Sequence, residues 1–353
     1  MDFKTIRDLD VKDKTVLVRT DYNVPIEDGQ IVSTLRIRES LPTLNYLLEH
    51  GAKKIVIISH LGRPEGKNIP ELSLSPVADA LRDLLPEEMI GFYDLPRDDE
   101  KLADISPCKI NLIENLRFDP GEEANSGEFA KKLIDYTEPD IFVQDGFAVI
   151  HRAHASTSAI AKFVPVCAGL LLESEVKNLT EVSENPTHPF VAIIGGSKVE
   201  DKKPLIEKFL KTADHIIVGG KIAADGYESD NEKIYVAEDF DEDSDGAKLD
   251  VGPVSTVKIA EFLKDAKTVV WNGLLGKAED PAYATSSAVV AEILGEMTDA
   301  KTVICGGDTT GFVEEIMEEH ENLNYSLIST GGGAALELLS GKKLPGLEVI
   351  EKK

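Results

Sequence analysis

Hydrophobic residues along the chain form short runs that alternate with stretches of helical periodicity. Runs typical of buried strands occur in the first half at 15–19, 54–59, 110–113 and 140–143. A helical pattern covers 35–50, where apolar residues recur at steps of three or four. Five further strand candidates lie at 190–194, 215–218, 268–271, 302–305 and 325–328, and helical patterns separate them at 200–212, 255–264, 285–297, 309–319 and 333–340. This alternation predicts parallel sheets covered by helices.

The length of the chain indicates two domains. At about 150 residues per domain, 353 residues are enough for two α/β units of Rossmann-like, parallel-sheet type. We place the first domain at 1–167 and the second at 168–334, with a helix over 168–179 between them. The strongly acidic stretch 238–245 is expected to be a solvated loop.

Composition excludes several classes of protein. A net charge of −26 argues against general nucleic-acid binding, which requires a basic surface. No apolar run approaches the ~20 residues of a membrane span, and the charged N-terminus has no signal-peptide core. The three cysteines are far apart and form no Cys-x-x-Cys pair, which argues against a disulfide framework or a zinc site. We therefore expect a protein of the reducing cytoplasm.

Arginine is distributed unevenly. All nine arginines lie in the first 152 residues, and the rest of the chain carries only lysine. This pattern favours an anion site in the first half of the chain. Such a site would be built from guanidinium groups that form bidentate hydrogen bonds with phosphate or carboxylate. Drift in Arg and Lys usage is the alternative explanation.

Polar residues follow the strands of the first half, where ligands bind in open parallel sheets. The residues at these predicted strand ends are Arg19, Asp21, Asn23, His60, Arg63, Arg117, His151 and Arg152. Arg36, at the start of the following helix, can join them. This set suits a small, highly anionic and hydroxylated ligand. A single His-x-x-Arg sequence, such as His60 to Arg63, is by itself typical of a surface turn.

The strand ends of the second half are rich in glycine instead. They carry Gly195, Gly196, Gly219, Gly273, Gly306, Gly307, Gly331 and Gly332. Glycine lets backbone N–H groups approach phosphates, and a helix N-terminus adds its positive dipole end. Lys198 and Lys202 supply charge, and Asp308 is a candidate ligand for Mg²⁺. The sequence has no Walker A pattern and no G-x-G-x-x-G pattern. Five glycine-rich strand ends in one domain nevertheless favour a nucleotide-binding site over the alternative that each one is only a tight turn.

These motifs together resemble the phosphoglycerate kinase family and follow its order along nearly the whole chain. They are 18–25 (VRTDYNVP), 59–64 (SHLGRP), 114–118 (ENLRF), 151–156 (HRAHAS), 195–199 (GGSKV), 270–273 (VWNG), 306–309 (GGDT) and 329–334 (STGGGA). The resemblance implies a hinge-bending kinase whose two domains face each other across a cleft. It also implies that the tail 335–353 packs back on the first domain.

The resemblance further implies reversible phosphoryl transfer between 1,3-bisphosphoglycerate and ADP, giving 3-phosphoglycerate and ATP. By motif match, Asp21 and Asn23 meet the hydroxyl and carboxylate end of the substrate, and Arg36 lies nearest the transferred group. The other substrate residues are Arg19, His60, Arg63, Arg117, His151 and Arg152. The nucleotide residues are Gly195, Gly196, Lys198, Lys202, Gly219, Asn272, Glu279 (ribose), Gly307, Asp308 (with Mg²⁺) and Thr309.

The attacking group in the reverse reaction is a carboxylate, whose ordinary pKa lies near ~4, so no general base is required. Catalysis is expected to rest on positioning and on the charges of Arg36, Lys198, Mg²⁺ and the helix N-terminus at Gly331 and Gly332. His60, His151 and His154 are expected to titrate near neutrality and to act through their charge.

Two alternatives remain at this point. One is another nucleotide-dependent kinase or ligase, and the other is a non-catalytic anion-binding homologue. The chain departs from the family after Asp145, after Gly273 and at Cys305, and its stretch 220–252 is short, which bears on the adenine pocket. We expect a monomeric, cytoplasmic enzyme of small-molecule substrates, without nucleic-acid or membrane partners.

Overall fold

The computed structural model describes residues 2–96, 100–320 and 322–353, so that Arg97 lies outside the described residues. Contacts divide the chain into two units. Unit 1 comprises Met1–Ser174 with Lys343–Lys353, and unit 2 comprises Glu175–Lys342. The division falls inside helix α6, Leu170–Glu184, which starts two residues later and ends five residues later than the helix expected from the sequence.

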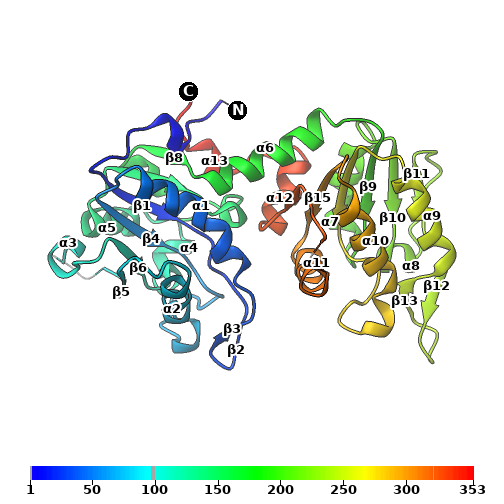
Figure 1. The fold of residues 1–353 in the computed structure, drawn as a ribbon, viewed down its shortest axis with the longest axis horizontal. Coiled ribbons are helices and arrows are strands. Elements are labelled where there is room, and N and C mark those ends of the chain that lie inside the picture. The colour runs from blue at the N-terminus through cyan, green and yellow to red at the C-terminus, as the bar shows by residue number, and fades with distance from the viewer. Residues whose placement is uncertain (1, 97–99, 321) are drawn as a thin grey trace. The chain divides into compact units, whose positions relative to one another are not determined.

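Unit 1 is built on a six-stranded parallel sheet in the order β5-β6-β4-β1-β7-β8 (Figure 1). Its strands are β1 Thr15–Arg19, β4 Lys54–Ile58, β5 Ile90–Tyr93, β6 Ile110–Ile113, β7 Ile141–Gln144 and β8 Val166–Ala168. Helices cover the sheet, so its central strands are buried on both faces and read as continuous apolar runs. The helices of the unit are α1 Leu35–Glu49, α2 Ser75–Leu84, α3 Leu102–Ile105, α4 Pro120–Glu123, α5 Gly127–Thr137 and α13 Pro345–Glu348.

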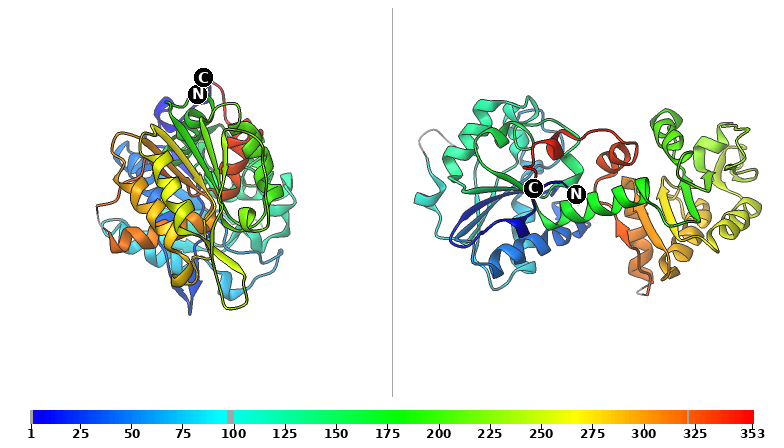
Figure 2. Two further views of the ribbon diagram at one scale, coloured as in Figure 1. Left: turned by 90° about the vertical axis from the view of Figure 1, so that its right-hand side faces the viewer. Right: turned by 90° about the horizontal axis from the view of Figure 1, so that it is seen from above.

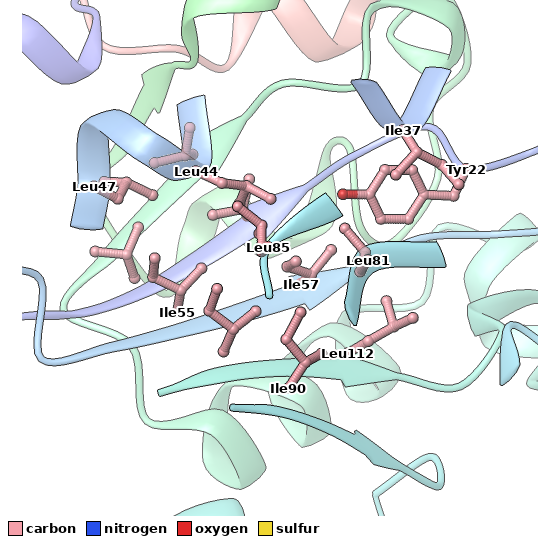
Figure 3. Close-up of a cluster of buried hydrophobic side chains, with 14 of the residues drawn as sticks. Tyr22, Ile37, Leu44, Leu47, Ile55, Ile57, Leu81, Leu85, Ile90 and Leu112 are labelled. Atoms are coloured by element: carbon pink, nitrogen blue, oxygen red, sulfur yellow. The ribbon is translucent and has the colours of Figure 1, made fainter. Parts of the chain in front are cut away.

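The core under α1 and α2 explains why these segments form helices. Ile37, Leu44 and Leu47 recur at helical spacing and pack on Ile55 and Ile57 of β4 (Figure 3). All five side chains are fully buried. Each contributes about 1.5–3 kcal/mol relative to an exposed side chain. This packing fixes the carboxyl ends of β1 and β4, where the polar residues begin.

Both ends of the chain belong to unit 1 and lie side by side (Figure 2). The amide of Lys4 donates to the carbonyl of Glu351 at 2.7 Å, and Lys4 also pairs with its side chain. The amide of Gly346 donates to the carbonyl of Ile150 at 2.8 Å. The tail from Lys343 is thus held on unit 1, whereas residues 335–342 belong to unit 2.

Unit 2 repeats the architecture with the order β11-β10-β9-β14-β15-β16, again parallel throughout. Its strands are β9 Phe190–Ile194, β10 His215–Val218, β11 Ile234–Val236, β14 Thr268–Asn272, β15 Lys301–Cys305 and β16 Leu327–Ile328. Its further helices are α7 Val199–Phe209, α8 Gly220–Ala224, α9 Pro253–Leu263, α10 Thr285–Glu296, α11 Gly307–Glu319 and α12 Gly332–Leu339. None of the described helices of either unit is long and apolar enough to cross a membrane.

The segment 238–245, expected to be a solvated loop, is exposed or half-buried throughout, but part of it is not a loop. The structure places a strand there, β12 Phe240–Glu242, which pairs antiparallel with β13 Lys248–Val251. Asp239 closes the base of this hairpin, because its carboxylate accepts hydrogen bonds from the amides of Val254 and Ser255 at the start of α9. A second small hairpin joins β2 Ile26–Glu27 to β3 Gln30–Ile31 in unit 1.

Candidate functional site

The polar residues that follow β1 in unit 1 form a hydrogen-bonded group. The carboxylate of Asp21 accepts a hydrogen bond from the guanidinium of Arg36, which comes from α1. Its second oxygen accepts the amide of Asn23 at 3.0 Å. Asp21 is buried, whereas the Arg36 side chain is 28% exposed. A half-buried cation is therefore positioned by a buried carboxylate at the end of the sheet.

The loop that follows β4 is tied to the same group. The side-chain oxygen of Asn23 accepts the amide of Gly62 at 2.8 Å, and Arg117 donates to the carbonyl of Gly62 at 2.7 Å. Gly62 has φ of +61°, a conformation that glycine adopts without strain. Arg117 is buried, and Arg63, next to Gly62, is exposed. The structure thus brings Asn23, Arg63 and Arg117 to one loop.

The histidines of this group do not behave as the sequence suggested. Burial, followed by the nearby Arg19 guanidinium, lowers the pKa of His60 well below its ordinary value. Burial and then Arg117 lower the pKa of His154 to about 4. The expectation that His60 and His154 titrate near neutrality is therefore wrong, because burial and clustered arginines disfavour the imidazolium.

Three further candidates of unit 1 have different degrees of exposure. His151 and Arg152 are half-buried and adjacent, with Arg152 Nε donating to His151 Nε2 at 3.2 Å. Arg19 has no exposed surface, and its Nε donates to the hydroxyl of Ser156 at 2.8 Å. Arg19 is therefore beneath the group and not at its surface.

Two buried residues contact the polar group of unit 1, although the sequence did not single them out as site residues. Glu122 and Ser156 are both fully buried and hydrogen-bonded to each other. Ser156 lies within the HRAHAS motif, which gave a signal for it. Glu122 gave none, because one acid among 64 acidic residues carries no pattern.

In unit 2, the ends of β9 and β14 approach so closely that only glycine fits. A Cβ on Gly195 would lie 2.4 Å from the carbonyl oxygen of Gly273, and one on Gly273 would lie 2.3 Å from the carbonyl carbon of Gly195. Gly273 also has φ of +100°. The amide of Gly196 donates to the carbonyl of Leu274 at 2.8 Å. These contacts bring the two strand ends together without side chains between them.

Two helix N-termini meet beside these strand ends. A Cβ on Gly332, at the start of α12, would lie 3.0 Å from the amide nitrogen of Gly307, at the start of α11. The first amides of a helix have no partner within the helix, so adjoining N-termini attract anions. Gly331 precedes α12, and Asp308 is exposed in the first turn of α11. Thr309 is buried, and its hydroxyl accepts the amide of Gly273 at 2.9 Å.

The remaining nucleotide candidates differ in how firmly they are held. Lys202 donates to the side-chain oxygen of the buried Asn272, and burial lowers the pKa of Lys202. Lys198 is exposed at the residue before α7. Gly219 precedes α8, and Glu279 is exposed on the loop after β14. Within the described ranges, no three His, Cys, Asp or Glu side chains cluster as a metal site would require.

The fold and these two groups define a class: phosphoryl-transfer enzymes built on two parallel α/β units. A model of the phosphoglycerate kinase family matches residues 6–234 and 223–342. The chain is 39% identical to the phosphoglycerate kinase of Moorella thermoacetica, over 99% of both chains, and 38% identical to that of Fervidobacterium nodosum, over 100% and 99%.

Solved structures agree. That of the phosphoglycerate kinase from Coxiella burnetii matches with a TM-score of 0.77 at 33% identity, and that from Pyrococcus horikoshii with 0.84 at 27%, each over 98% of both chains. The chain belongs to the phosphoglycerate kinase family. It is a phosphotransferase with a carboxyl group as acceptor, and it interconverts 1,3-bisphosphoglycerate and ADP with 3-phosphoglycerate and ATP.

The alignments of this chain with the two relatives contain gaps. The two alignments extend over 396 and 403 positions, against 353 residues here. The two segments of the family match overlap at 223–234. The family pattern therefore breaks inside the stretch 220–252, where the sequence suggested a shortened nucleotide domain.

Proposed function

We propose that unit 1 binds the phosphoglycerate substrate and unit 2 binds the nucleotide. The observation that carries this division is the contrast at the two sets of strand ends. Unit 1 presents arginine and histidine side chains, whereas unit 2 presents glycine backbone and helix N-termini. Guanidinium groups suit a small anion with carboxylate and phosphate. Closely approached backbone amides suit a polyphosphate chain.

In unit 1, we assign Asp21 and Asn23 to the hydroxyl and carboxylate end of 3-phosphoglycerate. The cations assigned to its phosphate and to the transferred group are Arg36, Arg63, Arg117 and Arg152, with His60 and His151 as additional donors. Arg36 is assigned as the catalytic member, because it is still partly accessible and is oriented by Asp21. Arg19 was expected to contact the ligand. Because it is fully buried, we assign it instead to the support of the site through its hydrogen bonds.

In unit 2, we assign Lys198 and Lys202 to the nucleotide phosphates and Glu279 to the ribose hydroxyls. Gly195, Gly196, Gly219, Gly307, Thr309 and Asn272 shape the site. Mg²⁺ retains several waters and binds proteins through one or two carboxylates plus phosphate oxygens, and this matches a single exposed Asp308. When bound there, it would neutralise charge on those oxygens.

The chemistry follows from these charges. In the glycolytic direction, a terminal phosphate oxygen of ADP attacks the acyl phosphorus, and the carboxylate of 3-phosphoglycerate leaves with the electron pair. In reverse, the carboxylate is already ionised, since the ordinary pKa of such a group is near ~4. Lys198, Arg36 and the N–H groups at Gly331 and Gly332 stabilise the transferred group in both directions. No residue of the chain needs to take a proton.

The test is an enzyme-coupled assay of the purified chain with 3-phosphoglycerate and Mg-ATP, and with other hydroxy acids as acceptors. We expect turnover that depends on 3-phosphoglycerate. Equal turnover with an unrelated acidic acceptor would overturn the substrate assignment. We further propose that the enzyme is a cytoplasmic monomer without nucleic-acid partners. Light scattering during size exclusion would return a mass of about 38 kDa, close to the 38.4 kDa of the chain.

A further inference from the structure

The buried carboxylate of Glu122 has no role in the reaction as described so far. It lies in α4, and both of its oxygens bind Ser156. One oxygen accepts the Ser156 hydroxyl at 2.6 Å, and the other accepts its amide at 3.0 Å. Burial raises the pKa of the Glu122 carboxyl, so the ionised form needs compensation by a nearby positive charge. The compensation lies on the far side of Ser156.

Ser156 joins Glu122 to Arg19. Its hydroxyl donates to Glu122 and accepts a hydrogen bond from Arg19 Nε at 2.8 Å. Arg19 Nη2 is also 3.9 Å from the nearer oxygen of Glu122. All three side chains are fully buried. The two opposite charges therefore hold each other through one hydroxyl, and the orientation of the guanidinium is fixed.

The other side of that guanidinium faces a histidine of the substrate group. Arg19 Nη2 lies 3.3 Å from His60 Nδ1. A guanidinium has donors and no acceptor, so His60 Nδ1 must supply the lone pair. In neutral imidazole the proton is then on Nε2. Asp21 Oδ1 is 3.7 Å from Nδ1, beyond a hydrogen bond, and therefore does not hold a proton there.

We propose that Glu122, Ser156 and Arg19 form a positioning relay that fixes His60 in its neutral tautomer with the proton on Nε2. His60 then meets the anionic substrate as a hydrogen-bond donor and not as a cation. The second half of this inference rests on the proposed function of His60. Glu122 and Ser156 contact no substrate in this proposal, and they act through Arg19.

The charges around His60 agree with this role. Arg19 from β1, Arg36 from α1 and Arg117 from the turn after β6 all oppose protonation of the ring, as does His154. Asp21 is the one acid at salt-bridge distance among the described side chains. Burial is the largest cause of the lowered pKa of His60. The ring is expected to stay neutral throughout the range where the enzyme works.

The test uses the full chain labelled with ¹⁵N-histidine, because imidazole nitrogen shifts distinguish protonated from unprotonated nitrogens. Spectra are recorded without ligand between about pH 5.5 and 8. We expect His60 Nδ1 to show the shift of an unprotonated acceptor and no titration in this range. A protonated Nδ1, or a shift that titrates near pH 6.5, would overturn the proposal.

Variants separate the relay from a general loss of structure. Arg19→Met combined with Glu122→Gln removes both buried charges together, so that neither is left uncompensated. We expect mixed His60 tautomers, a titration inside the pH range, and a KM for 3-phosphoglycerate that rises about twofold toward pH 8, in proportion to the share of the other tautomer. Thr137→Val, which loses a buried hydrogen bond to Leu133 in the same unit, is the control and leaves His60 unchanged.

The two measurements separate failure of the relay from failure of the assignment of His60 to the substrate site. A KM that rises equally at every pH, with the tautomer unchanged in the double variant, would show a merely structural or electrostatic role and overturn the relay. If the tautomer is fixed as expected but 3-phosphoglycerate does not shift the His60 Nε2 resonance, the assignment of His60 to the substrate site fails. The tautomer assignment would stand in that case.

Discussion

The two units carry their proposed anion sites at equivalent places, the strand ends of a parallel sheet, but the candidate groups there are of different kinds. In unit 1 the candidate groups are side chains, such as Arg36, which the buried Asp21 holds, and Arg117, which is buried and donates to the carbonyl of Gly62. In unit 2 the strand ends carry glycines packed backbone against backbone, as at Gly195 and Gly273. The chain has no arginine beyond residue 152.

This difference decides how each site can be damaged. A site made of side chains is lost when an atom group is removed, as in an arginine-to-alanine change. The part of a site that is made of backbone is insensitive to truncation and is lost when an atom is added, whereas a charged side chain of the same site, such as Lys198, can still be lost by truncation. Truncation of side chains in unit 1 and addition of a methyl group in unit 2 therefore test the difference between the two units most clearly.

The largest effect is expected from the charges on the transferred phosphoryl group. Lys198→Ala in unit 2 and Arg36→Ala in unit 1 should each lower kcat by ~10²–10³-fold, because such a charge stabilises the transition state. Lys203→Ala and Arg38→Ala, on the same helices and exposed, are matched controls that should keep kcat within about twofold. Steady-state kinetics measure kcat for all four variants. A control variant that lowers kcat as much as the variant it is matched to would contradict the assignment.

A single added methyl group should lower the stability of unit 2 more than truncation of a neighbouring side chain does. Gly273→Ala places a Cβ 2.3 Å from the backbone of Gly195 at a φ of +100°. We expect a loss of about 3 kcal/mol in the stability of this region, with ADP affinity lost and 3-phosphoglycerate affinity kept. Gly226→Ala has a similar φ but open space around it, so it reports the cost of strain alone. Equal losses in the two variants would refute the close-approach argument.

In unit 1, removal of a buried arginine should weaken binding of the substrate. Arg117→Ala is expected to lower the affinity for 3-phosphoglycerate by roughly 1.5–3 kcal/mol and to leave ADP binding unchanged. Thermal unfolding should show a loss of stability as well, because Arg117 holds the carbonyl of Gly62. Normal 3-phosphoglycerate affinity in a folded Arg117→Ala protein would remove this residue from the site.

The smallest expected effect concerns pH and a buried acid of unit 1. Burial raises the pKa of Asp145 from 3.8 to about 6. A raised acid pKa means that the folded state binds more protons, so this group's contribution to stability falls as pH rises from about 4 to about 6. Asp145→Asn keeps an oxygen for the amides of Leu171 and Leu172 but removes the titration.

The stability of the Asn variant relative to the parent should therefore rise across that interval, by order of 1 kcal/mol. Urea unfolding at about pH 4, 5 and 6.5 measures the difference. A difference that is constant with pH would show that Asp145 does not titrate in this range.

Much of the sheet scaffold was predictable because its strands are buried on both faces. The runs at 15–19, 110–113, 190–194 and 215–218 coincide with β1, β6, β9 and β10. The strands of the two parallel sheets that were missed, β5, β8 and β11, all lie at sheet edges, and β5 and β11 are not buried along their whole length. Hinge closure between the units stays a prediction.

The site was predictable as far as it depends on strand ends. Asp21, Arg36, His60 and Arg117 follow from the rule that parallel strands end at one edge. The partnership of Glu122 with Ser156 did not follow, because 34 residues separate them and only tertiary packing joins them. The lowered pKa values of His60 and His154 depend on burial, which motifs do not encode.

The central claim, that each unit binds its own ligand, is tested most directly by separate calorimetric titrations of the Arg63→Ala enzyme with 3-phosphoglycerate and with Mg-ADP. Arg63 is exposed, so its removal should leave the fold intact, and Arg82→Ala, in α2 of the same unit, is the control. The account predicts that the 3-phosphoglycerate affinity falls by about tenfold or more while the ADP affinity stays within twofold of the parent. A large loss of ADP affinity with normal 3-phosphoglycerate binding would contradict it.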